Sequence, residues 1–481
     1  MPTANTAQPA RAGAARVNVD PPTGLDLVGY LRRWQPSSGN GQPLEINVLV
    51  TEHAGERTAV VSLDAPSVVS SYALRMRAAV ARAIGCHPTA VMVNASHTHS
   101  APPLPGHLKT GGSTCLLRPE EERYAEALID HAAATAAQAA AALRPCRIGY
   151  GVDSFDGGVN RRQRTADGGT IMGWNPEGPR DPEVSVIRVD AVEGDPIATV
   201  VVYACHPTVL GPDILTSSSD FVGPLRQTVR QMLGGVCLFL QGTAGNIFPL
   251  QAVYDEVGAE VEFGRQLGRS ALRAWDRADP VIREPVQTPY RSSVDVALWR
   301  LTPARRQHPV ATTVVERPVE LPLQDLVTAA EMRQLGDGLR AELNSLRKAG
   351  APRERWNPVW LHIAWADRME ARIAAGETTT TVRSSVYARL LGHVLIIALP
   401  CEPFCEIGLE LKQTFDVPTV VLGYTNDMVG YVATAEEYPL GGYEPWIAPR
   451  HFDQPCPFDP SIARVLTDAA IEAGREALAS H

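Results

Sequence analysis

The sequence lacks the features that mark membrane-spanning, secreted and nucleic-acid-binding proteins. It contains no run of about 20 apolar residues, which argues against a membrane-spanning helix. Residues 1–20 have no apolar core of the kind that a signal peptide carries. No cluster of lysine and arginine stands out, and the formal net charge is −9, so a nucleic acid is an unfavourable partner. We therefore expect a cytoplasmic protein with a small-molecule substrate, no nucleic-acid partner and no stable membrane anchor.

Cysteine is sparse as well. The eight cysteines are scattered through 481 residues, mostly in apolar runs, which predicts buried free thiols and not a disulfide framework. Cys401 and Cys405 have no second pair at the spacing of a zinc knuckle. A glycine-rich phosphate-binding loop with its lysine is also missing, which argues against a phosphate-handling enzyme. The content of 44% hydrophobic and 20% charged residues is ordinary for a globular protein with a substantial core.

Strand-like and helical segments alternate along most of the chain. This order predicts an α/β fold with a mixed β-sheet core and flanking helices. The basic stretch 157–164 is predicted to be a loop. Residues 1–15 are expected to form a flexible N-terminus and residues 16–481 one domain. A span at about 280–380, rich in Arg and Pro and containing two charged helices, is expected to be an insertion or lid. Strands are predicted at 44–51, 58–63, 147–151, 184–190, 197–205, 236–240, 379–390, 393–399 and 419–423, and helices at 68–84, 119–143, 222–232, 257–275, 326–348, 358–375, 402–415 and 460–478.

The strongest functional signal is the segment 91–100, an apolar strand that runs directly into His97 and His99. In an extended chain alternate side chains point the same way, so both imidazoles would face one point in space. Imidazole is the commonest metal-binding side chain, and zinc needs three or four ligands from separated parts of a chain. The motif alone is short, and it suits a polar strand end equally well.

Two further apolar strands end on polar side chains in the same way, one at His206 and one at Glu402. In α/β proteins ligands gather beyond the carboxyl ends of strands, so separate strand ends can converge on one site. Each of the two residues precedes a proline, which favours an extended backbone. The ordinary alternatives are a histidine satisfied by a neighbouring carbonyl and a glutamate at a helix N-terminus. Cys205, beside His206, is assigned to the core.

These segments resemble the neutral, non-lysosomal ceramidases and their bacterial relatives. The resemblance runs from about residue 16 to about residue 450, with the blocks in the order of the family. It implies a ceramidase-like catalytic domain, which this chain would carry without the C-terminal immunoglobulin-like domain of the ceramidases. The blocks are Ser96-His-Thr-His-Ser-Ala-Pro, Cys205-His-Pro-Thr, Gln241-Gly-Thr-Ala-Gly-Asn-Ile-Phe-Pro, Cys401-Glu-Pro-Phe, and Tyr431-Val-Ala-Thr-Ala-Glu-Glu-Tyr with Tyr443-Glu.

The resemblance also implies a zinc hydrolase whose Zn²⁺ is held by two histidines, a glutamate and a tyrosine. His99 matches a second, non-ligating histidine that is near enough to move a proton. Arg161 matches a basic residue that contacts polar groups of the substrate. Tyrosine is an unusual zinc ligand on physical grounds. Carried onto the matching positions, the ligands are His97, His206, Glu402 and Tyr431.

The expected activity is hydrolysis of an amide bond by a metal-activated water. Phe248 stands where the family has serine in a Gly-Asn-x-Ser-Pro block, so an N-acyl or small-molecule amide is expected and not a true ceramide. An esterase or lactonase with the same site is an alternative, and so is a non-catalytic binding protein on the same fold; a homo-oligomer is left open. Asp64 and Asp220 are second choices for holding the ligand histidines through their other ring nitrogen, and the backbone amides of 242–246 for stabilising an oxyanion.

Overall fold

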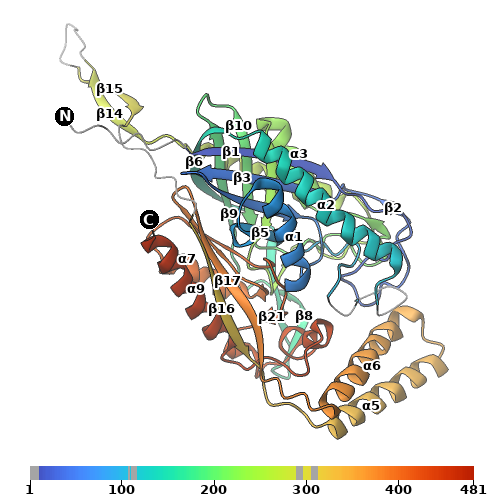
Figure 1. Cartoon of the computed structure of the whole chain (residues 1–481). Helices are drawn as coiled ribbons and strands as arrows, with labels where there is room; N and C mark the ends of the chain where they lie inside the picture. The colour runs from blue at the N-terminus through green and yellow to red at the C-terminus, as the bar shows by residue number, and fades with distance from the viewer. Residues whose placement is uncertain (1–9, 107–108, 110–115, 289–295, 305–312, 481) are drawn as a thin grey trace.

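The computed structural model describes residues 10–106, 109, 116–288, 296–304 and 313–480. The described elements form four layers, with helices on the outside and two β-sheets packed face to face between them (Figure 1). The predicted α/β class, a mixed sheet core with flanking helices, is confirmed. Among the described helices, none combines the length and the apolar character that crossing a bilayer requires.

The larger sheet has eight strands in the order β12-β10-β9-β6-β1-β3-β4-β5. Both faces are buried over much of the sheet, so strands such as β5, β10 and β12 are apolar at nearly every position and not only at alternate ones. In β3, for example, Val48 packs towards the outer helices and Leu49 towards the second sheet. The strands are β1 (Arg11–Asn18), β3 (Glu45–His53), β4 (Glu56–Leu63), β5 (Val91–Ala95), β6 (Arg144–Ser154), β9 (Glu183–Ala191), β10 (Pro196–Tyr203) and β12 (Val236–Gln241).

The smaller sheet has the order β16-β17-β18-β20 and packs on the inner face of the larger one. Its strands are β16 (Val314–Pro322), β17 (Thr381–Leu391), β18 (Val394–Ala398) and β20 (Thr419–Leu422). Apolar helix faces cover the outside of both sheets. The larger sheet is covered by α1 (Ser70–Ile84), α2 (Pro119–Ala141), α3 (Val222–Leu233) and α4 (Ala259–Arg277), and the smaller one by α7 (Cys405–Thr414) and α9 (Ile462–Ala479).

Asn94, fully buried in β5, joins three strand ends that are far apart in the sequence. Its side-chain oxygen accepts the N–H of Gln241, at the end of β12, at 2.8 Å. Its amide nitrogen donates to the carbonyl of Gly423 at 2.9 Å and to the hydroxyl of Thr425 at 3.0 Å, just after β20. The carboxyl ends of β5, β12 and β20 are therefore held at one place, and the candidate site lies there.

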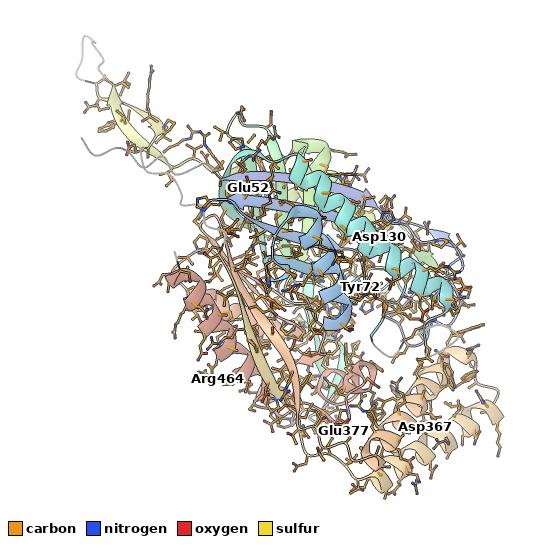
Figure 2. The ribbon with its side chains drawn as sticks, in the orientation of Figure 1. Glu52, Tyr72, Asp130, Asp367, Glu377 and Arg464 are labelled. Carbon is orange, nitrogen blue, oxygen red and sulfur yellow. The ribbon has the colours of Figure 1, made fainter. Side chains whose placement is uncertain are left out.

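The span 280–380 contains three different structures. The hairpin of β14 (Arg283–Thr288) and β15 (Leu298–Pro303) projects from the body of the molecule, whereas β16 belongs to the smaller sheet (Figure 1). The third is a helical hairpin of α5 (Ala329–Lys348) and α6 (Arg353–Ala374), in which Asp367 of α6 pairs with Arg340 of α5 (Figure 2). Residues 289–295 and 305–312 lie outside the described residues.

Three local expectations differ from the structure. The stretch 157–164 is not a loop: Gly158–Arg164 is strand β7, paired with β8 (Thr170–Asn175), and its buried arginines are neutralised by glutamates from distant segments. Strand β1 begins at Arg11, so residues 11–15 belong to the larger sheet, while residues 1–9 are outside the described residues. Glu402 lies in the short strand β19 (Glu402–Pro403), ahead of helix α7.

Candidate metal centre

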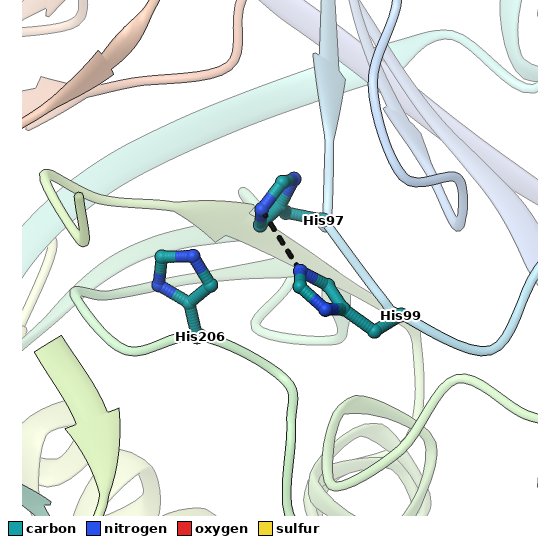
Figure 3. Close-up of side chains that lie close together, drawn as sticks. All are labelled: His97, His99 and His206. Atoms are coloured by element: carbon teal, nitrogen blue, oxygen red, sulfur yellow. Dashed lines mark hydrogen bonds between the residues drawn. The ribbon is translucent and has the colours of Figure 1, made fainter. Parts of the chain in front are cut away.

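His97 lies just beyond β5 in an unusual backbone conformation. Its φ is +65°, in the left-handed region, so the chain is not extended here and the predicted alternation of side chains does not apply. The imidazole still faces the site, because its backbone N–H donates to the Ala65 carbonyl at 2.9 Å and its Nδ1–H donates to the Pro66 carbonyl. This tautomer leaves the Nε2 lone pair free for a metal ion. The predicted convergence holds, since His99 Nε2 is 3.2 Å from His97 Nε2 (Figure 3).

His206 follows β10 and is fully buried. Its Nδ1 contacts the carbonyls of Ala244 at 2.7 Å and Ile247 at 3.1 Å, so this nitrogen carries the proton and Nε2 keeps a lone pair. Burial, reinforced by the positive charge of Arg161, lowers the pKa of His206 to about 3. The ring is therefore a neutral imidazole, the form that binds metals.

Glu402 completes a compact group with these two histidines. Its Oε2 lies 3.2 Å from His97 Nε2 and 3.3 Å from His206 Nε2, and it accepts a hydrogen bond from the Tyr424 hydroxyl at 3.4 Å. Burial alone would raise the pKa of Glu402, but the two adjacent imidazoles outweigh burial and hold it well below its usual range. The buried carboxylate is therefore charged.

The spacing of these atoms fits a metal ion. In a tetrahedral zinc site with bonds of about 2.0–2.1 Å, neighbouring ligand atoms lie about 3.3 Å apart. The distances from Glu402 to His97 and His206, 3.2 and 3.3 Å, are of that size. The rings of His97, His99 and His206 also gather around one point, with one nitrogen of each within 4.8 Å of the others (Figure 3).

Two side chains are placed near a fourth ligand position. Tyr431, in β21 (Tyr431–Val432), is paired in register with Glu402 and lines the same pocket. His99 is the other, because its Nε2 is close to that of His97. Burial and the neighbouring imidazoles of His97 and His206 lower the pKa of His99 well below its usual value. His99 is therefore a neutral imidazole.

Arg161, in β7, brings a positive charge to the group and is only 1% exposed. Its Nε donates to Glu444 at 2.8 Å, and its Nη1 lies 3.2 Å from His206 Nε2. The guanidinium stacks on the ring of Phe248, with 4.7 Å between its carbon and the ring centroid, and it lies 5.3 Å from the centroid of Tyr431. Phe248 thus makes a cation–π contact that orients Arg161.

Asp64 and Asp220, the two aspartates expected to hold the histidines, bind other groups instead. Asp64 accepts hydrogen bonds from Arg226 and from the backbone of residue 45. Asp220 accepts backbone N–H groups of residues 209, 210 and 221. Those expectations are wrong because backbone carbonyls already meet His97 and His206 at the strand ends.

The loop 242–246 passes beside the ligands, and the amides of Gly242 and Gly245 already donate to backbone carbonyls. The Gly245 N–H donates to the Pro403 carbonyl at 2.8 Å, and the Gly242 N–H donates to the Tyr203 carbonyl at 3.0 Å. A Cβ on Gly245 would lie 2.6 Å from the carbonyl oxygen of Glu402. Glycine is needed there because the loop passes directly against the strand that carries the carboxylate.

Sequence reasoning missed Tyr424 and His451, and it gave no role to Tyr443, which it named only as part of a block of the resemblance. Tyr424 packs its ring 4.5 Å from that of His97 and bonds to Glu402. It follows strand β20, so the signal that marks the other site residues, a polar side chain after an apolar strand, also marks Tyr424. Tyr443 and His451 line the pocket from irregular segments near the C-terminus, where no periodic pattern identifies them.

His97, His99, Glu402 and Tyr431 line a pocket of about 720 Å³, a volume that includes space open to solvent at the mouth. A mostly apolar wall with a few convergent polar groups is typical of a small-molecule site. The apolar part of the wall consists of Val28, Leu31, Pro66, Pro103, Leu104 and Phe452.

Comparison with solved structures finds ceramidases. The neutral ceramidase from Pseudomonas aeruginosa superimposes with a TM-score of 0.66 at 17% sequence identity, covering 97% of this chain and 74% of the ceramidase chain. A ceramidase complexed with C2 gives a TM-score of 0.66 at 16% identity, covering 97% and 75%. Protein-family models and curated protein sequences give no match. The ceramidase-like fold that the sequence resemblance implies is therefore confirmed over nearly the whole chain.

Proposed function

We propose that this protein is a zinc-dependent hydrolase that cleaves an amide bond in an N-acyl or other small-molecule substrate. The observation that carries this proposal is the spacing of His97, His206 and Glu402, whose donor atoms meet at metal-ligand distances within a partly apolar pocket. The ceramidase-like fold supports the choice of amide hydrolysis.

We assign the zinc ligands as His97, His206, Glu402 and Tyr431. The chemistry of this donor set, two imidazoles, a carboxylate and a phenol oxygen, suits zinc. When bound, zinc lowers the pKa of a water ligand from about 15.7 to about 7 and so supplies hydroxide at neutral pH.

The remaining groups of the pocket have separate roles in this proposal. Arg161 faces the site with a fixed positive charge and would stabilise the oxyanion that forms at the substrate carbonyl, an effect worth roughly 3–4 kcal/mol for one well-placed donor. His99, neutral and beside His97, would take up a proton and deliver it to the leaving nitrogen. The apolar wall would receive the acyl group.

Metal analysis and single substitutions test the proposal. Protein purified without chelator should contain one transition metal ion per chain, and His206→Ala should lose both the metal and hydrolysis of N-acyl amides. Cys205→Ala is the matched control, because Cys205 is the buried neighbour of His206 and belongs to the core. Absence of stoichiometric metal, or full activity in His206→Ala, would overturn the proposal.

The fourth ligand is tested separately. Tyr431→Phe should lower the metal affinity, whereas His99→Gln should retain the metal and lose turnover. The opposite result would assign His99 to the metal, which its distance of 3.2 Å from His97 Nε2 also permits.

An ester or lactone substrate is the second candidate, because an activated water attacks the carbonyl of a C–O bond by the same route. A panel that pairs each N-acyl amide with its ester separates the two. Retained metal with no turnover of any substrate would instead favour the non-catalytic binding protein.

A further inference from the structure

Four polar side chains form a continuous row from helix α6 to the pocket, here called the relay. Arg450 Nη1 lies 3.5 Å from His362 Nδ1, and His362 Nε2 lies 3.0 Å from His451 Nε2. His451 Nδ1 lies 3.0 Å from the hydroxyl oxygen of Tyr443. His362 is in α6, and Arg450 and His451 are in the 3₁₀ helix η3 (Ala448–Phe452). Tyr443 opens the short helix α8 (Tyr443–Trp446) and lines the pocket.

The chemistry of the first member sets the direction of every hydrogen bond in the relay. A guanidinium only donates, so His362 must accept at Nδ1 and carry its proton on Nε2. His362 Nε2–H then donates to His451 Nε2, which places the proton of His451 on Nδ1. His451 Nδ1–H donates to the oxygen of Tyr443, and the hydroxyl hydrogen of Tyr443 is left for another acceptor.

This order requires that each imidazole carries one proton. Both are in low-dielectric surroundings: burial, reinforced by Arg450, lowers the pKa of His362 to about 4. Burial, followed by the charges of His362 and Arg450, lowers the pKa of His451 to about 3. Two neutral rings between a fixed donor and a hydroxyl permit only the order described above.

We propose that Arg450, His362 and His451 are positioning residues that turn the hydroxyl hydrogen of Tyr443 into the pocket, where it donates to the carbonyl oxygen of the substrate. The direction of the relay is a property of this chain alone, whereas the contact with substrate rests on the proposed function.

Helix α6 is fixed on both sides of the pocket, so the relay does not depend on one contact. Asn357 of α6 donates to the carbonyl of Leu31, a wall residue, at 2.8 Å. Trp365 of α6 donates to the carbonyl of Gln454 at 2.8 Å, and the guanidinium of Arg450 lies 5.4 Å from the Trp365 ring centroid. The helical hairpin thereby holds His362 in line with the segment that carries His451.

Nitrogen NMR of the protein labelled with ¹⁵N-histidine tests the relay without any activity. We expect the Nε2–H tautomer for His362 and the Nδ1–H tautomer for His451, each assigned by the signal that disappears in its glutamine variant. Arg450→Met should remove the fixed donor and mix the tautomers of both rings. An Nε2–H tautomer of His451 in the unaltered protein would overturn the proposal, even if every variant failed to fold.

Kinetics on a hydrolysed amide test the contact with substrate. Tyr443→Phe should lower kcat by about 100-fold, the usual cost of one lost donor to an oxyanion. Arg450→Met should lower kcat about tenfold with KM little changed, and it should have no further effect in the Tyr443→Phe background.

Arg368→Met is the matched control, because Arg368 ties α6 to Asp453, next to η3, through its guanidinium, as Arg450 of η3 contacts α6, but Arg368 is not in the relay. It should keep kcat within a factor of about two. Equal losses in Arg368→Met and Arg450→Met, or additive losses in the double variant, would assign Arg450 a merely structural role. A protein with the expected tautomers but no hydrolytic activity would refute the proposed function and leave the relay standing.

Discussion

At the scale of single residues, the site depends on which ring nitrogen each histidine presents. His97 and His206 both donate through Nδ1 to backbone carbonyls, so both turn Nε2 towards Glu402. The left-handed backbone of His97 is a strained conformation for a residue other than glycine, and such strain is concentrated at functional sites.

Gly29 provides a residue-scale prediction. Its φ is +109°, and a Cβ there would lie 2.4 Å from Cγ of the His99 ring. Gly29→Ala should therefore displace His99 and lower kcat by about 100-fold, the usual contribution of a proton-transfer group, while the bound metal is retained. Gly24→Ala is the control, since its φ of +96° carries a similar backbone penalty and nothing lies within 4 Å. Equal activity of the two variants would contradict the assigned role of His99.

The buried carboxylate of Glu45 predicts how stability depends on pH. Burial alone would raise its pKa, but Arg226, Arg230 and Asn47 outweigh burial and lower it from 4.5 to about 2. A carboxyl with a depressed folded-state pKa contributes stability that is present above about pH 4.5 and lost as the pH falls towards 2, here about 3 kcal/mol. Urea unfolding between pH 6 and 2.5 should show this loss in the unaltered protein and a flatter profile in Glu45→Gln. The same dependence of the unfolding free energy on pH in both proteins would refute this role of Glu45.

At the scale of elements, the ends of β5, β12 and β20 meet because one side chain satisfies all three. The side-chain oxygen of Asn94 accepts the backbone N–H of Gln241, and its amide nitrogen donates to the Gly423 carbonyl and the Thr425 hydroxyl. Asn94 is buried at the junction of the two sheets, so a backbone group that lost its hydrogen bond to Asn94 could not bond to water instead.

Asn94→Ala should therefore cost about 1–3 kcal/mol of unfolding free energy, because it removes the side-chain acceptor of the buried Gln241 N–H and leaves the Gly423 carbonyl with the Thr425 hydroxyl as its remaining side-chain donor. The affinity for metal should fall as well, since the strand ends carry the ligands. Chemical denaturation and metal titration measure both effects. Asn47→Ala is the control. Asn47 is equally buried in the larger sheet, and its amide nitrogen donates to Glu45 at 3.2 Å. A loss no greater than that of Asn47→Ala would contradict the role of Asn94 as a junction.

At the scale of the whole molecule, the candidate metal centre lies where the two sheets meet. His97 and His206 follow strands of the larger sheet, while Glu402 follows β18 of the smaller one. At this point the carboxylate of Glu402 lies between the imidazoles of His97 and His206, close to the hydrogen bonds of Asn94. A bound cation should therefore stabilise the packing of the two sheets, in addition to any catalytic role.

Zinc at 100 times its dissociation constant should add about 2.7 kcal/mol to the stability of the folded protein. Calorimetry should show a lower Tm after treatment with chelator and recovery on adding Zn²⁺. His206→Ala should melt at the same temperature with and without zinc, and an unchanged Tm in the chelated wild-type protein would argue against a metal that binds the folded state.

The sequence by itself determined the fold class, most helices and strands, and the residues that follow apolar strands, because these depend on local periodicity and on the direction of the chain at a strand end. It did not reveal that Gly158–Arg164 is a strand, since its arginines are buried only when Glu437 and Glu444 arrive from the far end of the chain. Nor did it reveal the left-handed turn at His97, the carbonyl partners of the histidines or the relay from α6. Those depend on contacts that local periodicity does not relate, across 31 positions for His97 and Pro66, 38 for His206 and Ala244, and 89 for His362 and His451. Only the packing of the two sheets and the helical hairpin decides them.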